Sequence, residues 1–311
     1  FINFIMLDQN IQEHNKNKIL ILGSNGQLGS HLSNDLAKLG EVTSLDRNGF
    51  NFESPESLDL IIKRLSPKFI VNAAAFTNVD GAEDFEKIAY QVNALTVKKL
   101  AILAHENNAV LIHFSTDYVF DGLKEEPYLE NDIARPISVY GNSKLEGENY
   151  INEICSKYLI LRTSGVISKN EDNFISKIIN LSNDRDELNI VSDQQSSLNF
   201  SGFISQAVLE ILTELESNID KEKRWGIYHL SGQEPGTWYE FAKFTQEISK
   251  KINPDSNFSK IDINPIPSTQ FIQKAKRPKY SFLSSVKLKE DFGIELPNWK
   301  KSIIEVMENN E

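Results

Sequence analysis

The sequence predicts an α/β protein, and three observations carry this prediction. Short, almost continuously apolar runs alternate with helical patterns in the first half of the chain, as in parallel sheets covered by helices on both faces. A glycine-rich turn directly follows the first apolar run. After about residue 165 the alternation becomes less regular, and prolines break the last quarter into short pieces. Together these features predict a Rossmann-type doubly wound parallel sheet and a smaller, partly irregular C-terminal domain.

The first half of the chain supplies the strands and helices of this sheet in order. KILILG, residues 18–23, is a strand that stops at a glycine, and a helical pattern follows it through Leu39. The strand-like residues 42–46 come next. A further helix begins where Ser54 is the capping residue and Pro55 takes the first helical position.

Two more strands lead into small and polar residues. The run 69–75 is the third strand, and residues 110–116 are the fourth. A long helical pattern from Ala82 to about Asn107 separates them. Sheets of this kind bind ligands at the carboxyl ends of their strands, so we expect a site where these strands end.

Composition and charge exclude several classes of function. A net charge of -11 and a pI of about 5.1 argue against a nucleic-acid or anionic-membrane surface, because such surfaces use clustered positive charge. No uninterrupted apolar run approaches the length of a membrane span. The one cysteine, Cys155, fits a reducing compartment, and we expect a cytoplasmic protein. The five histidines lack metal-ligand spacing, so no catalytic metal is predicted.

GSNGQLG, residues 23–29, has the features of a dinucleotide-binding turn. Gly23 permits the tight turn, Gly26 lets the backbone approach a pyrophosphate, and Gly29 allows helix and strand to pack closely. Asp46, 20 residues beyond Gly26, ends the second strand and can accept both ribose hydroxyls of NADH. Arg47 follows at once and can instead hold the 2′-phosphate of NADPH. The cofactor is therefore NADPH or NADH.

VYGNSKLEGE, residues 139–148, places a tyrosine and a lysine four residues apart. Tyr140 and Lys144 share one helix face at this spacing, which by itself is common on solvated helices. STDYVFDG, residues 115–122, ends the fourth strand and contributes a hydroxyl residue, Thr116.

These motifs resemble the dTDP-4-dehydrorhamnose reductase family of the extended short-chain dehydrogenase/reductase superfamily. The motifs that carry the resemblance are GxxGQLG, VNAAAFTNVDGAE, STDYVFDG, VYGNSKLEGE, LRTS, the later DQ, GIYHLSG, the TWYEFA helix and KRPKYSFL. They occur in the family's order and cover nearly all of the chain from about Lys18. The resemblance implies NAD(P)H-dependent reduction of the 4-keto group of a nucleotide-linked 6-deoxyhexose, most closely dTDP-4-dehydro-L-rhamnose to dTDP-L-rhamnose.

The resemblance also assigns roles to single residues. Tyr140 is the proton donor, and a Lys144 ammonium is expected to lower its pKa from the ordinary value of about 10. Thr116 holds the substrate carbonyl, Thr116 and Asp117 match the sugar-contacting pair, and Arg277 is expected to face the diphosphate. The expected cofactor-binding residues are Gly23, Asn25, Gly26, Gln27, Leu28, Gly29, Asp46, Arg47, Ala73, Ala74 and Ala75, together with Tyr140 and Lys144.

The chain departs from the family at two places on the substrate side. Gly165 follows LRTS where the family has tryptophan, and residues 195–199 read QSSLN where the family has Gly, Pro and Thr. The sequence is therefore also compatible with a substrate that has a different 4-keto-6-deoxy sugar or a nucleotide other than dTDP. The alternative function is a non-catalytic dinucleotide-binding regulatory subunit, similar to the beta subunit of methionine adenosyltransferase.

The motifs divide the chain into three parts. Residues 1–16 are expected to be a polar N-terminal extension, and residues 17–165 the dinucleotide-binding Rossmann domain. Residues 166–311 are mainly a substrate-binding domain, although the segment around 188–215 is expected to return to the Rossmann domain. The partners are a dTDP-linked nucleotide sugar and, compatible with the sequence, a second copy in a homodimer.

Overall fold

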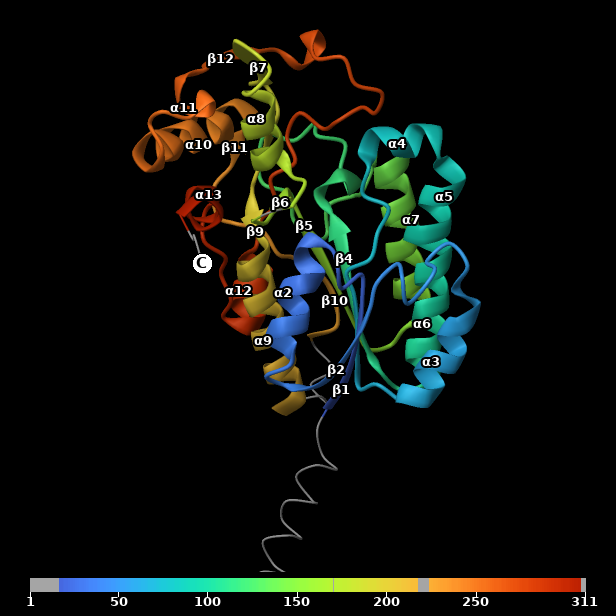
Figure 1. Cartoon of the computed structure of the whole chain (residues 1–311). Helices are drawn as coiled ribbons and strands as arrows, with labels where there is room; N and C mark the ends of the chain where they lie inside the picture. Colours follow the sequence, from blue (N-terminus) through green and yellow to red (C-terminus); the bar gives the residue numbers. More distant parts are fainter. Residues whose placement is uncertain (1–16, 170, 218–223, 309–311) are drawn as a thin grey trace, which may run out of the picture.

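The computed structural model describes residues 17–169, 171–217 and 224–308. The predicted N-terminal extension lies outside these residues. A six-stranded sheet forms the centre of the molecule, and all of its neighbouring strands are parallel (Figure 1). In spatial order the strands are β2 (Gly40–Leu45), β1 (Asn17–Leu22), β3 (Phe69–Asn72), β4 (Val110–Thr116), β5 (Tyr158–Thr163) and β10 (Gly226–His229). The predicted doubly wound Rossmann-type sheet is confirmed.

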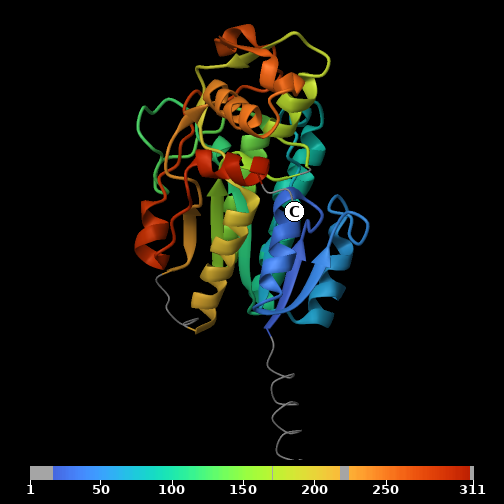
Figure 2. The same cartoon turned by 60° about the vertical axis from the view of Figure 1, so that its left-hand side comes forward.

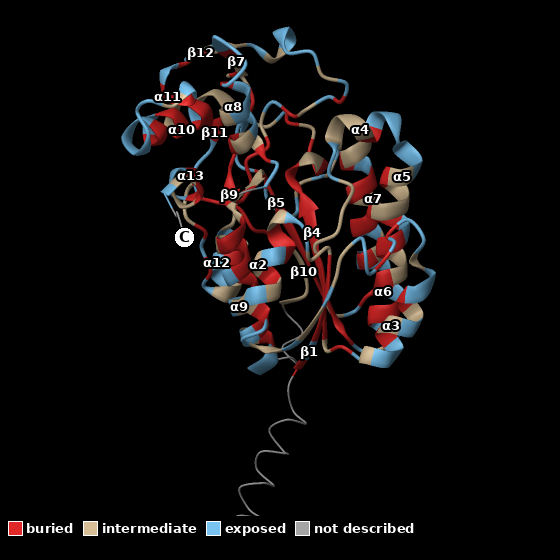
Figure 3. Cartoon of the chain, in the orientation of Figure 1, coloured by how far each residue is buried: buried red, intermediate tan, exposed pale blue. Residues whose placement is uncertain are grey.

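Helices cover both faces of this sheet. One face carries α2 (Gln27–Leu36), α9 (Ser201–Ser217) and α12 (Val286–Phe292); the other carries α3 (Leu58–Leu65), α6 (Thr96–Glu106) and α7 (Val139–Ile154). Strand β1 shows why its run is continuously apolar. Ile19 and Ile21 join the core under α2 and α9, whereas Leu20 and Leu22 join the core under α3 and α6. Figure 3 shows both buried layers in red against the exposed outer helix faces.

The predicted helix from Ala82 to Asn107 is several helical pieces. They are α4 (Val79–Asp84), α5 (Glu86–Tyr90), the π-helical turn η2 (Gln91–Leu95) and α6, with a break at Phe85. The Asn93 amide explains the irregular turn, because it exchanges hydrogen bonds with the Phe76 backbone N–H (2.8 Å) and C=O (3.1 Å). Side-chain periodicity does not reveal such a tertiary tie. π-Helical turns of this kind are frequent near functional sites.

A second layer of structure lies beyond the carboxyl ends of the sheet (Figure 2). Its helices are α8 (Phe174–Leu181), α10 (Trp238–Ile252), α11 (Asn257–Lys260) and α13 (Trp299–Glu308). Its short strands pair as β7 (Glu187–Val191) with β12 (Asp262–Ile266), β8 (Gln195–Ser196) with β11 (Gly236–Thr237), and β6 (Val166–Ile167) with β9 (Asn199–Phe200). Single turns at Pro55–Ser57 (η1), Asp117–Val119 (η3) and Ser268–Gln270 (η5) complete the described elements.

The chain after residue 165 contributes to both layers. Helix α9 packs on α2, and β10 extends the central sheet beside β5. Strand β7, by contrast, pairs with β12 in the outer layer. The two expected domain boundaries stay a prediction. In the described parts of the chain, no helix is long and apolar enough to cross a membrane.

Candidate active site

The glycine-rich turn lies where β1 and β3 end side by side. Gly23 has a left-handed φ of 82°, and a Cβ on it would stand 2.7 Å from the Ala74 backbone nitrogen. A Cβ on Gly29 would stand 2.0 Å from the Gly23 oxygen, so α2 packs directly on the turn. At Gly26 the nearest such atom is 3.4 Å away, which leaves that face of the turn open. The tight turn at Gly23 and the close packing at Gly29 match the roles expected of these two glycines, and the pyrophosphate contact at Gly26 stays a prediction.

The first turn of α2 completes this part of the site. Gly26 is the N-cap residue, and it offers no side chain to satisfy the first backbone N–H groups. No acidic residue occupies the first turn. Free N–H groups and the positive end of the helix dipole favour an anion. The open turn and this helix end therefore fit the pyrophosphate of a dinucleotide.

Asp46 and Arg47 follow β2 beside the turn. The Asp46 carboxylate accepts hydrogen bonds from the Asn48 and Gly49 backbones at 2.9 Å and from the Asn25 side chain. The hydrogen bond from Gly49, followed by those from Asn48, holds the pKa of Asp46 below its ordinary value. Arg47 is exposed. The structure thus gathers Asn25, Asp46 and the turn at one edge.

Two other expected cofactor residues have structural contacts. The Leu28 side chain is buried in the core. Gln27 accepts hydrogen bonds from Ser168 (3.1 Å) and Asn173 (3.3 Å), and Asn173 caps helix α8. Gln27 therefore joins the glycine turn to the outer layer, a contact that sequence spacing does not indicate. Residues 73–75 follow β3 and are half-buried.

Thr116 and Tyr140 meet at the carboxyl end of β4. Ser138 caps α7, and a Cβ on Gly141 would stand 2.2 Å from the Tyr118 oxygen, so the helix begins against η3. Burial raises the pKa of Tyr140 to about 12; a hydrogen bond with the Thr116 side chain opposes this shift and the Asp117 charge adds to it. The pKa of Tyr140 is thus raised, whereas the sequence predicted a lowered pKa, because burial outweighs the hydrogen bond with Thr116.

Lys144 lies one helical turn beyond Tyr140 and is 2% exposed. Its ammonium nitrogen donates to the Phe114 carbonyl at 2.6 Å and lies 3.3 Å from His113 Nε2. Burial lowers the pKa of Lys144 to about 8. Lys144 is therefore held by β4. The side chains that shift the pKa of Tyr140 are Thr116 and Asp117, and not Lys144 as expected.

Asp117 lies behind Thr116 and is 3% exposed. Its carboxylate accepts hydrogen bonds from Thr116 (3.1 Å), from Ser196 of β8 (3.1 Å) and from Ser281. Burial raises the pKa of Asp117 to about 6, although the three hydroxyl donors oppose the shift. The carboxylate therefore ties the end of β4 to two segments of the outer layer.

Arg277 lies apart from the glycine turn, at the α4 side of the site. Its guanidinium donates to both oxygens of Asp80, at 2.8 and 3.2 Å, and it also hydrogen-bonds Tyr118. The Ala275 N–H donates to Asp80 as well, at 2.9 Å. These contacts fasten the segment before residue 278 to α4. Asp80 was not among the predicted site residues, because it lies within the family motif VNAAAFTNVDGAE and no spacing pattern singles it out.

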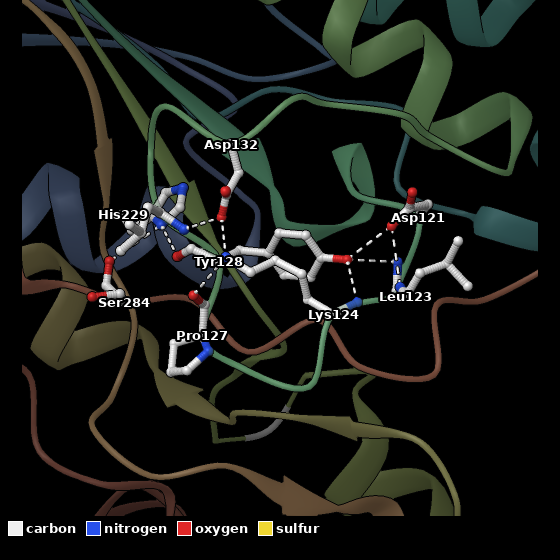
Figure 4. A network of polar contacts seen from close by, with 10 residues as sticks. Asp121, Leu123, Lys124, Pro127, Tyr128, Asp132, His229 and Ser284 are labelled. Atoms are coloured by element: carbon white, nitrogen blue, oxygen red, sulfur yellow. Dashed lines mark hydrogen bonds and ion pairs between the residues drawn. The ribbon is translucent and has the colours of Figure 1, made fainter.

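A polar network anchors the loop that leaves the site after η3 (Figure 4). The Tyr128 hydroxyl donates to Asp121 at 2.9 Å and accepts from the Gly122 N–H at 3.0 Å. His229 of β10 hydrogen-bonds the carbonyls of Tyr128 (3.1 Å) and Ser284 (3.2 Å) through Nδ1. The network fixes the loop against the edge of the sheet. It also explains why His229 is fully buried, as a core histidine is expected to be.

The two departures from the family pattern touch each other. A Cβ on Gly165 would stand 2.7 Å from Leu198 Cδ2, and the Asn199 N–H donates to the Gly165 carbonyl at 2.7 Å. Trp238 of α10 borders the same position, 3.8 Å from that Cβ. The small residue at 165 and the leucine at 198 thus form one packing arrangement on the substrate side.

Fold and site together define a Rossmann-type protein of the extended short-chain dehydrogenase/reductase class. The chain belongs to the RmlD substrate binding domain family, whose model matches residues 17–311. It is 36% identical over 287 residues to a dTDP-4-dehydrorhamnose reductase of Burkholderia thailandensis, covering 92% of this chain and 96% of the relative.

Solved structures agree with this assignment. A dTDP-4-dehydrorhamnose reductase from Clostridium acetobutylicum superimposes with a TM-score of 0.84 at 33% identity, covering 93% of this chain and 98% of the other. The Bacillus anthracis dTDP-4-dehydrorhamnose reductase in complex with NADP gives a TM-score of 0.81 at 29% identity, with 94% and 98% covered.

Proposed function

We propose that this protein reduces the 4-keto group of dTDP-4-dehydro-L-rhamnose with NADPH or NADH, yielding dTDP-L-rhamnose. The observation that carries the proposal is the gathering of Thr116, Tyr140 and Lys144 at the end of β4, the strand beside β3. The names of relatives that match nearly the whole chain support the same reaction.

In this proposal Tyr140 donates the proton. A nicotinamide, when bound, would supply the hydride for the carbonyl carbon, and the carbonyl oxygen would then need a proton from the protein. The pKa of Tyr140, raised by burial, keeps its hydroxyl protonated at neutral pH. Thr116 hydrogen-bonds the phenol, and its single hydroxyl proton, which Asp117 accepts in this structure, would turn to the carbonyl oxygen when the substrate binds. Lys144, one helical turn further along α7, is proposed to replace the proton that Tyr140 gives up.

The residues at the ends of β1 and β2 would hold the cofactor. The open face at Gly26 and the first turn of α2 take the pyrophosphate, and Asp46 takes the adenosine ribose. The exposed Arg47 is available for a 2′-phosphate. Both NADPH and NADH are therefore proposed as donors.

On the substrate side, Thr116 contacts the sugar and Arg277 faces the diphosphate. Asp117 acts as the support of Thr116, because its carboxylate is buried and occupied by three hydroxyl donors. We further propose that the protein works in the cytoplasm as a homodimer. Its free Cys155 fits a reducing compartment, and sedimentation measures the oligomeric state.

The test is oxidation of NADPH and NADH, followed at the nicotinamide absorbance, with enzymatically generated dTDP-4-dehydro-L-rhamnose. NMR spectroscopy identifies the stereochemistry at C4 of the product. We expect turnover and dTDP-L-rhamnose. Binding of the cofactor without turnover would instead favour a regulatory subunit. If the protein turns over another nucleotide-linked 4-keto-6-deoxy sugar and does not turn over dTDP-4-dehydro-L-rhamnose, that other sugar is its substrate.

A further inference from the structure

A buried polar row lies directly behind Lys144. His113 of β4 and Asn72 of β3 are partners in the register of the central sheet, and both side chains are buried. Asn72 Nδ2 lies 3.0 Å from His113 Nδ1, and His113 Nε2 lies 3.3 Å from Lys144 Nζ. The row thus connects the end of the third strand to the lysine of the site.

The direction of each hydrogen bond in this row follows from one backbone group. The Ala74 N–H donates to Asn72 Oδ1 at 3.2 Å, which fixes the amide oxygen toward Ala74. The amide NH2 group must then face His113, so Nδ1 of the ring accepts a hydrogen bond. A neutral imidazole that accepts at Nδ1 carries its proton on Nε2. This N–H points at Lys144.

An ammonium group cannot accept a hydrogen bond from that N–H. A neutral lysine amine can, because it has a lone pair, and its own N–H groups still donate to the Phe114 carbonyl at 2.6 Å. We infer that His113, oriented by Asn72, is a positioning residue that stabilises the neutral amine of Lys144 and so makes Lys144 a proton donor to Tyr140. This inference rests on the proposed reductase function.

The proton balance is simple. Tyr140 gives its hydroxyl proton to the carbonyl oxygen of the substrate, and the Lys144 ammonium gives one proton to the resulting phenolate. The neutral amine then accepts a hydrogen bond from His113 Nε2–H, and the imidazole itself neither gains nor loses a proton. Solvent returns the lysine to its charged form after turnover.

The other charged groups around Lys144 are accounted for. Glu148 lies one turn further along α7 and favours the ammonium, but Arg162 of β5 pairs with it at 2.6 Å. Asp117 on η3 acts on the pKa of Tyr140, whereas the charge that acts on the pKa of Lys144 is that of Glu148. Burial lowers the pKa of Lys144 to about 8 and the pKa of His113 well below its usual range. The lysine can therefore change charge near neutral pH while the imidazole stays neutral.

The first test is the tautomer of His113 in the wild-type protein. Two-dimensional 15N NMR of histidine-labelled protein distinguishes the two neutral tautomers, and loss of one signal set in His113→Gln assigns the residue. We expect the Nε2–H tautomer at every pH from 6 to 9. An Nδ1–H tautomer, or a charged ring, would overturn the inference whether or not the protein turns over a nucleotide sugar.

The second test uses Asn72→Asp to reverse the direction of the hydrogen bonds between residue 72, His113 and Lys144. A carboxylate still accepts from the Ala74 N–H but cannot donate to His113, so the ring proton should move to Nδ1 and Nε2 should accept from a Lys144 ammonium. We expect the pKa of Lys144, measured by 13C NMR at Cε and assigned with Lys144→Met, to rise by about one unit or more, which is tenfold in proton affinity.

The control for the added charge is Asn93→Asp. Asn93 is a second buried asparagine, and its side-chain hydrogen bonds go to Phe76 and Ser143 instead of His113. The control variant should leave the His113 tautomer unchanged and move the pKa of Lys144 less than Asn72→Asp does. An equal rise in the control would mean that charge alone acts on Lys144. An unchanged Lys144 pKa in Asn72→Asp, despite a switched tautomer, would also contradict the inference.

Discussion

At the scale of single residues, burial determines the chemistry of the site. It raises the pKa of Tyr140 and lowers that of Lys144, so both side chains favour their neutral forms. Spacing predicted that the two residues share a face of α7. Spacing could not predict how Lys144 is held, because its partners, Phe114 and His113, belong to a strand that precedes it by about thirty residues.

Asp117 should make stability depend on pH. Its pKa rises from 3.8 in the unfolded chain to about 6 in the folded protein, so the folded state binds this proton more tightly. The protonated Asp117 therefore adds to the free energy of unfolding below about pH 4, and this addition is lost as the pH rises through 6. The loss amounts to about 3 kcal/mol. Urea unfolding between pH 4 and 7 should therefore show this fall in wild type and lose it in Asp117→Asn.

The matched control is Asp59→Asn. Asp59 is a partly exposed carboxylate that pairs with Lys99 at 2.5 Å, and this contact lowers its pKa. Its replacement should leave the fall between pH 4 and 6 in place. Identical pH profiles for wild type and Asp117→Asn would show that the Asp117 carboxylate is not held in the buried network described above.

At the scale of elements, the alternation of apolar runs and helical patterns correctly predicted four of the six strands of the central sheet, β1 to β4, and did not predict β5. It failed between residues 82 and 107, where one expected helix is broken at Phe85 and passes through a π-helical turn. The reason is tertiary, since Asn93 satisfies the backbone of Phe76. Likewise, the pairing of β10 with β5 joins segments about 70 residues apart and is seen only in the fold.

Gly165 and Leu198 should be energetically coupled. Gly165→Ala places a methyl group 2.7 Å from Leu198 Cδ2, and such overpacking costs about 1–3 kcal/mol of unfolding free energy. Leu198→Ala alone should cost about 2–5 kcal/mol, because the side chain is buried. In the double variant the alanine at 198 makes room for the methyl group. The double variant should therefore lose about 1 kcal/mol less unfolding free energy than the two single variants lose together.

Urea unfolding of the four proteins measures this coupling. Gly165→Ala combined with Leu212→Ala is the control, since Leu212 lies in the separate core under α9. Those two changes should be additive. Additivity for the Gly165 and Leu198 pair would mean that the two departures from the family pattern arose independently of each other.

At the scale of the whole molecule, the site lies between the sheet and an outer layer that several polar contacts attach to it. Gln27, Asp117 and Asp80 each bond a segment of the outer layer. Motif order predicted cofactor contacts at the ends of β1 and β2, and these contacts stay a prediction. It did not predict these attachments, because they join residues more than 70 positions apart that share no sequence pattern.

Arg277 is the attachment with a proposed substrate contact. Arg277→Gln should raise KM for the nucleotide sugar by about tenfold or more, as expected for a charge-assisted hydrogen bond to a diphosphate. The dissociation constant of the cofactor should stay the same. Lys276→Gln is the neighbouring control, because Lys276 is exposed, and it should change neither value. If KM is the same in Arg277→Gln, Arg277 has only a structural role, through its contacts with Asp80 and Tyr118.

The central claim is that Tyr140 donates the proton for ketone reduction. The most direct measurement is single-turnover oxidation of NADPH with dTDP-4-dehydro-L-rhamnose in wild type and Tyr140→Phe, together with the dissociation constant of NADPH for each. The account predicts that the variant binds NADPH as wild type does and reacts at least about 10²-fold more slowly. A Tyr140→Phe protein that reacts at the wild-type rate would contradict the account.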